Sequence, residues 1–179
     1  RSKPRPCASS NTRAAAGRCV RSWISRAPAI RLAIPPALQA IAAALAMWGI
    51  DRLSPASDVA FAGQVLLAWL VGGAGAVILF LALGLFRRAE TTVDPRYPSR
   101  SDTIVTGGIY RVTRNPMYVG MALVLLAIAI ATGDVLNLLV LAFFLWFITR
   151  FQIRPEEEAL RAKFGEAYDS YTRRVRRWL

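Results

Sequence analysis

The chain has 179 residues, of which 55% are hydrophobic, and its 23 Lys and Arg residues outnumber 11 Asp and Glu residues, for a net charge of +12. Histidine is absent, which excludes a histidine general base, histidine metal ligands and a Ser-His-Asp triad. The basic residues flank long apolar blocks and do not form one stripe. Anionic lipid headgroups, and no nucleic acid, are therefore the expected partner.

The first 32 residues are rich in Arg, Ser and Ala and contain no acidic residue. We expect residues 1–32 to form a basic, disordered tail, either cytoplasmic or of the transit-peptide type. Both cysteines, Cys7 and Cys19, lie in this tail at a spacing typical of neither a zinc site nor a redox pair. No metal site is expected, so the chemistry has to come from other polar side chains or from a bound cofactor.

Four apolar segments follow the tail and predict an all-α integral membrane protein with about four transmembrane helices in one domain, residues 33–179. The segments expected to cross the bilayer are 33–50, 62–86, 117–132 and 135–149. The second segment is long and free of charge, and its Gly72, Gly73 and Gly75 allow a neighbouring helix to approach closely.

Only Gly133 and Asp134 separate the third and fourth segments, which are therefore predicted to form a tight antiparallel hairpin. Basic residues concentrate before the first segment, between the second and third, and after the fourth. An even number of crossings places all three basic regions on one side, and the positive-inside rule assigns that side to the cytoplasm. We expect a protein of the bacterial inner membrane with both termini in the cytoplasm.

From Pro155 onward the pattern predicts one amphipathic helix over residues 155–178. Its apolar stripe consists of Leu160, Phe164, Tyr168, Tyr171, Val175 and Trp178. Arginines surround the end of the stripe, which is typical of a helix lying on headgroups. The same helix is also expected to form a lid over a site at the membrane surface.

The first polar cluster precedes the third apolar segment. Gly107 and Gly108 allow a turn whose N–H groups suit an anionic ligand group. Pro116 restricts Asn115 to extended geometry and is expected to start the third helix, with Tyr118 on its first turn. Each residue taken alone also has an ordinary structural explanation, such as an interfacial tyrosine or a proline at a helix start.

The second polar cluster, residues 150–158, follows the fourth segment and contains three consecutive glutamates. These acids suit the first turn of a helix. One cluster enters the final hairpin and the other leaves it, so connectivity alone predicts that they meet. The residues expected to lie within reach of one another are Arg114, Asn115 and Tyr118 from the first cluster and Arg154, Glu156 and Glu157 from the second.

Together the clusters resemble a known family. Residues 108–120, with the sequence GIYRVTRNPMYVG, resemble the G-x-Y-R-x-x-R-H-P-x-Y-x-G signature of isoprenylcysteine carboxyl methyltransferases. Residues 156–171 resemble that family's C-terminal segment E-E-x-x-L, F-G-x-x-Y-x-x-Y. The wider superfamily includes phospholipid methyltransferases, and the chain is similar to its bacterial-type members. The resemblance covers about residues 86–178.

The resemblance implies a helical membrane enzyme that binds S-adenosyl-L-methionine at the cytosolic surface under its C-terminal segment and admits a lipophilic or prenylated substrate between helices. The implied cofactor-binding residues are Thr103, Ile104, Val105, Tyr110, Asn115, Pro116, Met117, Tyr118 and Glu156. The implied catalytic residues are Arg154 and Glu157, and the implied substrate-binding residues are Arg150 and Arg154. The methyl acceptor that the resemblance implies is an isoprenylcysteine-like carboxylate or another lipid.

Two positions depart from the family pattern. Asn115 stands where the signature has His, and an amide forms hydrogen bonds but cannot take up a proton charge. Gln152 falls near the position of a substrate-side arginine, with Arg150 and Arg154 as possible substitutes. A carboxylate acceptor needs no base and favours such an arginine clamp. An amine acceptor has to be deprotonated, for which Glu157 is the available base.

Two other functions are compatible with the pattern. A sterol-type membrane reductase resembles this family in its C-terminal hairpin and would use NADPH. A non-enzymatic membrane adaptor would use the glutamates only as helix-capping residues. The cofactor that the protein binds distinguishes the three classes: S-adenosyl-L-methionine for a methyltransferase, NADPH for a reductase and neither for an adaptor.

Overall fold

A computed structural model describes residues 34–53, 59–88 and 106–179. The expected N-terminal tail lies outside the described residues. The elements in chain order are α2 (Pro36–Leu53), α3 (Gln64–Arg88), a 3-10 turn (Gly108–Arg111), α4 (Pro116–Thr132), α5 (Leu136–Ile148), a π-helical turn (Thr149–Ile153), α6 (Arg154–Phe164) and α7 (Glu166–Arg174). The described ranges contain no strand, only a single bridge between Thr113 and Arg176. The predicted all-α class is confirmed.

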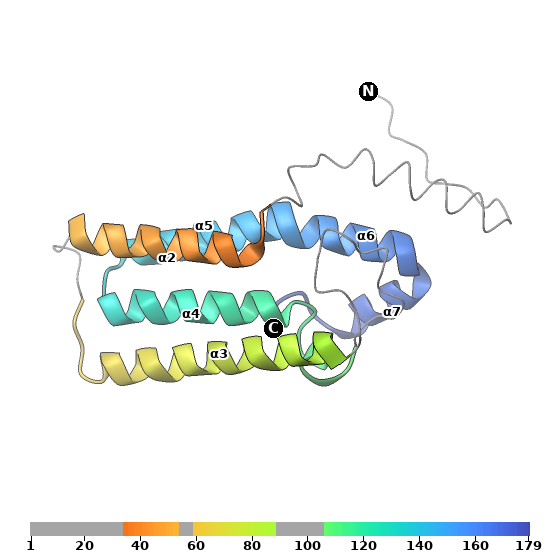
Figure 1. The fold of residues 1–179 in the computed structure, drawn as a ribbon, viewed down its shortest axis with the longest axis horizontal. Helices are drawn as coiled ribbons and strands as arrows, with labels where there is room; N and C mark the ends of the chain where they lie inside the picture. Colours follow the sequence, from red (N-terminus) through yellow and green to blue (C-terminus); the bar gives the residue numbers. More distant parts are fainter. Residues whose placement is uncertain (1–33, 54–58, 89–105) are drawn as a thin grey trace, which may run out of the picture.

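Helices α2 to α5 run side by side, with α4 in the middle of the bundle (Figure 1). Helix α3 packs on one side of α4, while α2 and α5 pack on the other side and against each other. The start of α2, the end of α3, the start of α4 and the end of α5 all lie at the end of the bundle that carries α6 and α7 (Figure 1). The polar segments attached there are thus brought to one end, as an even number of crossings requires.

Within the described ranges, two helices are long and apolar enough to cross a membrane: Gln64–Leu85 and the continuous run Leu136–Phe164. Helix α4 is apolar but shorter. The outer helices carry large apolar side chains that face away from the protein, including Trp48, Trp69, Phe80 and Phe143. So many exposed large apolar side chains on the helices of a bundle are unusual for a water-soluble monomer. The outer faces of α2, α3 and α5 therefore suit a lipid environment.

The close packing of α3 on α4 depends on two glycines. A Cβ atom added at Gly75 would lie 2.8 Å from the carbonyl oxygen of Gly120 and 2.9 Å from Cβ of Leu123. One at Gly72 would lie 3.2 Å from Cβ of Ala127, whereas Gly73 has no atom within 4 Å of that position. Small residues let helix backbones approach where dispersion contacts, not water exclusion, drive association. The predicted role is confirmed for Gly72 and Gly75 and is wrong for Gly73.

The predicted tight hairpin between the last two apolar helices is also confirmed. Gly133 ends α4 in the left-handed region, with φ 72°, which glycine adopts at no steric cost. The next residue, Asp134, accepts a hydrogen bond from the backbone N–H of Leu136 through Oδ1, at 2.8 Å. The amide of Gln64 at the start of α3 donates to the carbonyl of Ile130, at 2.7 Å, which satisfies the end of α4.

The predicted fourth apolar helix, 135–149, and the amphipathic sequence from Pro155 are joined without a loop. Helix α5 continues through the π-helical turn into α6, in which Arg154 N–H bonds to the carbonyl of Thr149, five residues back. Pro155 lies in the first turn of α6, where its missing N–H is tolerated. The wide turn directly before the proline lets one helix carry both the apolar and the acidic sequence.

The predicted amphipathic helix 155–178 is in fact two helices and an extended end. Gly165, with φ 53°, separates α6 from α7, and the chain is extended from Val175. The stripe residues Leu160, Phe164, Tyr168, Tyr171 and Val175 still pack together in one cluster. Trp178 instead packs against the main core, whose buried members are Met47, Tyr118, Leu125, Phe144, Ile148 and Ile153. Part of the stripe therefore faces protein, because Tyr168 and Tyr171 are buried.

We expect Gly75→Ala to destabilise the bundle by about 1–3 kcal/mol, because the added methyl group meets backbone atoms of α4 that cannot move aside locally. Gly73→Ala is the matched control and should be neutral or slightly stabilising, since alanine is the better helix former. Thermal unfolding of the purified protein in detergent measures both. Equal midpoints for the two variants would contradict the packing of α3 on α4.

Candidate active site

The two polar clusters meet at the end of the bundle. The hydroxyl of Tyr118, on the first turn of α4, donates a hydrogen bond to Oε1 of Glu156, on the first turn of α6, at 2.7 Å. The guanidinium of Arg114 lies 3.0 Å from Oε1 of Glu157. The entry to the final hairpin and its exit therefore form one polar site, as connectivity predicted.

The hydrogen-bond donors that the structure shows around Glu156 are neutral. In addition to Tyr118, the side-chain amide of Gln152 donates to Glu156 Oε1, at 2.9 Å. Tyr118 and Gln152 are both buried, at 7% and 2% exposure. No Lys or Arg among the described residues forms an ion pair with Glu156. An ionised carboxylate here keeps a charge that the described part of the protein does not neutralise, and such a group favours a cationic ligand.

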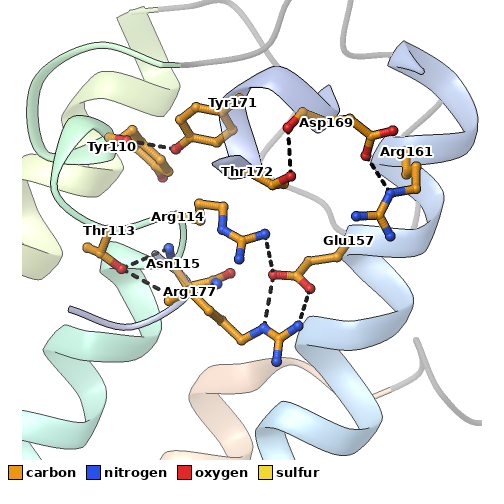
Figure 2. Close-up of polar contacts among 10 residues, drawn as sticks. All are labelled: Tyr110, Thr113, Arg114, Asn115, Glu157, Arg161, Asp169, Tyr171, Thr172 and Arg177. Carbon is orange, nitrogen blue, oxygen red and sulfur yellow. Dashed lines mark hydrogen bonds and ion pairs between the residues drawn. The ribbon is translucent and has the colours of Figure 1, made fainter. Parts of the chain in front are cut away.

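Glu157, the next residue, has the opposite surroundings (Figure 2). Arg177 donates to both of its carboxylate oxygens, at 3.0 and 2.6 Å, and Arg114 pairs with Oε1 from the other direction. The Glu157 side chain is 12% exposed. Bidentate pairing with an arginine is the strongest geometry for such a contact. Glu157 therefore joins the start of α4 to the C-terminal segment.

The extended C-terminal segment lies across the start of α4 (Figure 2). The carbonyl of Arg177 accepts hydrogen bonds from Oγ1 of Thr113, at 3.1 Å, and from the side-chain amide of Asn115, at 3.0 Å. The backbone N–H of Arg114 donates to the carbonyl of Arg176, at 3.0 Å. Asn115, which stands where the signature has His, thus donates a hydrogen bond to the protein's own backbone.

Tyr110 is buried in the 3-10 turn that precedes α4. Its backbone carbonyl accepts a hydrogen bond from the hydroxyl of Tyr171 in α7, at 2.7 Å (Figure 2). Burial and the neighbouring Tyr168 raise the pKa of Tyr171 to about 12. The Tyr171 hydroxyl therefore stays protonated at neutral pH and keeps α7 attached to the turn.

The structure brings most of the implied cofactor-binding residues to this site. Pro116 is buried at the first turn of α4, and Met117 beside it is partly buried. Thr103, Ile104 and Val105 lie outside the described residues.

Arg150 and Arg154 do not join the site, contrary to the expected proximity of Arg154 to the first cluster. Each lies two residues before an inward-facing residue, Gln152 or Glu156, which is about 200° around a helix. Both arginines are exposed, and with Leu145, Trp146 and Thr149 they line a separate hollow of about 300 Å³. The sequence shows that these positions are basic, but it does not show the direction in which they point around the helix, because that direction depends on the π-helical turn.

A second, apolar groove of about 160 Å³ adjoins the site. It is an open groove between α4 and α5 that the C-terminal residues help to line, and its lining consists of Val119, Ala122, Leu123, Leu126, Leu141, Leu145, Trp178 and Leu179. Val119 follows Tyr118 in α4, and Trp178 follows Arg177, so the groove begins where the polar site ends.

Two contributors were missed by reasoning from the sequence. Arg177 was grouped with the surface arginines, although it completes the Glu157 ion pair. Gln152 was considered only as a replacement for an arginine, although its position four residues before Glu156 places both on one helix face. That spacing was the available signal for Gln152, and nothing in the arginine run distinguished Arg177.

The described residues form a helical bundle with two membrane-length helices and a buried polar site where they end, the class of structure expected of a membrane-embedded enzyme. Residues 63–167 match the phospholipid methyltransferase family, so the chain belongs to that family. The match begins just before α3 and extends into α7, and therefore includes both polar clusters.

Two curated proteins are similar to parts of the chain. An uncharacterized protein of Haemophilus influenzae is 43% identical over 63 residues, which cover 35% of this chain and all of that protein. The protein-S-isoprenylcysteine O-methyltransferase of Schizosaccharomyces pombe is 29% identical over 105 residues, which cover 54% of this chain and 44% of that enzyme. No solved structure matches significantly. The resemblance noted from the two motifs is confirmed, and the coarse function that follows is that of a membrane methyltransferase.

We expect Glu157→Gln to lower stability by about 2–3 kcal/mol, because it leaves two partly buried guanidinium groups without their carboxylate. Trypsin should then cleave faster at the arginines of the C-terminal segment. Glu158→Gln, which changes an exposed neighbour on the same turn, is the control. Unchanged melting and cleavage in the Glu157 variant would show that the ion pairs do not hold this segment.

Proposed function

We propose that the protein transfers a methyl group from S-adenosyl-L-methionine to a lipophilic acceptor at the cytoplasmic surface of the membrane. The observation that carries the proposal is the Glu156 carboxyl group, which is held by Tyr118 and Gln152 and has no cationic partner among the described residues. Membership of the phospholipid methyltransferase family supports the same reaction.

The residues present fit this cofactor. S-adenosyl-L-methionine is a cation at its sulfonium and carries an ammonium group, and Glu156 offers an unneutralised acceptor for such charge. Tyr118 and Gln152 fix the orientation of the carboxyl group, so little is lost on ordering it when the ligand binds. When bound, the cofactor supplies a methyl group already activated by the sulfonium. The protein's part is then to align the acceptor and exclude water.

The apolar groove between α4 and α5 supports a lipophilic acceptor. Its lining is wholly apolar and adjoins the polar site through Val119 and Trp178. An acceptor whose tail lies in this groove presents its polar end beside Tyr118 without leaving the membrane. Trp178 packs on the core and lines this groove, which adds to its apolar surface.

For the acceptor group we propose a carboxylate, as in an isoprenylcysteine-like lipid. Both oxygens of Glu157 are bound to arginines, so the base that an amine acceptor requires is already engaged. A carboxylate needs no base. Nε of Arg114 is buried with no hydrogen-bond partner among the described residues and is a suitable donor for an anionic acceptor. The S. pombe relative is named for O-methylation of a prenylated substrate, which supports the same class.

We further propose that α2 and α4 cross the membrane together with the two longer helices, with both termini in the cytoplasm of a bacterial cell. The side-by-side arrangement of the four helices supports this (Figure 1). Helix α4 is shielded by the other three, so its modest length of about 25 Å needs no direct match to the lipid.

S-adenosylhomocysteine should raise the melting temperature of the purified protein, and NADPH should not. The reverse result would favour a sterol-type reductase, and no response to either ligand would favour the adaptor.

By titration calorimetry, Glu156→Gln should weaken S-adenosylhomocysteine binding by about tenfold, the effect of losing one charged contact. Glu158→Gln should not, because Glu158 is exposed. Equal losses in the two variants would remove Glu156 from the cofactor site.

Membranes that contain the protein should transfer radiolabel from methyl-labelled S-adenosyl-L-methionine into extracted lipid, and mild base should release that label as methanol. An ester is cleaved by base, whereas a methylated amine or thioether is not. Base-stable label would overturn the carboxylate assignment and favour an amine.

The Tyr118→Phe variant should retain the chemistry but bind the cofactor less tightly, because Glu156 loses one of its two positioning donors.

A further inference from the structure

The outward face of the long α5–α6 helix changes from apolar to basic along its length. Leu139, Phe143 and Trp146 are exposed large apolar residues on α5. Their spacing of four and three residues places them on one face, and Arg150 follows four residues later on the same face. Arg154 is exposed one turn further on. This face therefore runs from lipid-compatible surface through an indole ring to two guanidinium groups.

The two arginines line a hollow that has no acidic partner. The hollow of about 300 Å³ is bounded by Leu145, Trp146, Thr149, Arg150 and Arg154. Neither guanidinium forms an ion pair with any residue that the structure describes. Arg150 stacks over the ring of Phe151, with 5.8 Å from Cζ to the ring centre, which holds its side chain near the helix.

We propose that this hollow binds the headgroup of an anionic phospholipid, with the phosphate between Arg150 and Arg154 and the acyl chains along the apolar face of α5. Paired guanidinium groups suit a phosphate in geometry and charge. Trp146 belongs at the level where headgroup meets hydrocarbon. Along the helix, apolar residues would contact the acyl chains, the aromatic residue would lie at the boundary, and the basic residues would contact the anionic headgroup.

This lipid is distinct from the methyl acceptor. The hollow shares Leu145 with the apolar groove, but none of its lining residues belongs to the polar site, because Arg150 and Arg154 each lie two residues before an inward-facing residue, Gln152 or Glu156. The proposed lipid site has no part in methyl transfer and does not depend on the proposed function. In this proposal the two arginines bind a lipid of the surrounding bilayer.

The test is binding of dioctanoyl phosphatidylglycerol to the full chain in detergent, measured by native mass spectrometry. We expect one lipid to bind in preference to dioctanoyl phosphatidylcholine. The double variant Arg150→Gln, Arg154→Gln should weaken that binding by about 30-fold, since each arginine near an anionic headgroup contributes about fivefold. Each single variant should lose about fivefold, which provides the measurement if the double variant does not fold.

The control is Arg173→Gln, Arg174→Gln, which removes the same charge from exposed positions on α7. It should bind phosphatidylglycerol as the parent does. An equal loss in this control would reduce the effect to general attraction by a basic protein and overturn the proposal. Competition by millimolar inorganic phosphate would also overturn it, because the hollow would then be a site for free anions. Equal affinity for phosphatidylcholine would remove the role of headgroup charge.

Discussion

Two adjacent glutamates at the start of α6 hold the functional end of the protein together. Glu156 bonds to Tyr118, and Glu157 pairs with Arg114 and Arg177. Successive residues of a helix point about 100° apart, so one turn of α6 contacts both the start of α4 and the extended C-terminal segment. The two carboxyl groups differ in their partners. Neutral donors hold the first, and cations neutralise the second, so among the described residues only the first lacks a cationic partner.

The π-helical turn decides which residues share that end. Because α5 continues into α6 without a break, each side chain after Thr149 is fixed in direction by the helix and not by a flexible loop. Gln152 and Glu156 consequently face α4, while Arg150 and Arg154 face outward. π-Turns inside α-helices often occur at functional sites. Here the turn separates a polar site inside the protein from a basic hollow on its outer face.

Much of this arrangement was predictable from the sequence because it follows from local rules. The hairpin needs only the glycine and aspartate between two apolar runs, and the meeting of the polar clusters follows from that hairpin. The directions of the arginines were not predictable. Pro155 followed by three glutamates is typical of the first turn of a new helix. The sequence contains no sign that a π-helical turn joins this turn to the preceding helix. The break at Gly165 was missed because the apolar spacing continues across it.

The family match includes one part of the polar end and stops before the other. Residues 63–167 contain Tyr118, Gln152 and Glu156, the three side chains proposed to receive the cofactor. Arg177 lies beyond that range, yet it neutralises Glu157 and its carbonyl is bound by Asn115. An asparagine at the signature's histidine position therefore has a structural role that needs no proton transfer: its amide donates to the segment that covers the site. The proposed ligand recognition and the attachment of the C-terminal segment thus involve neighbouring glutamates with different partners, so a change in one partner set need not abolish the other.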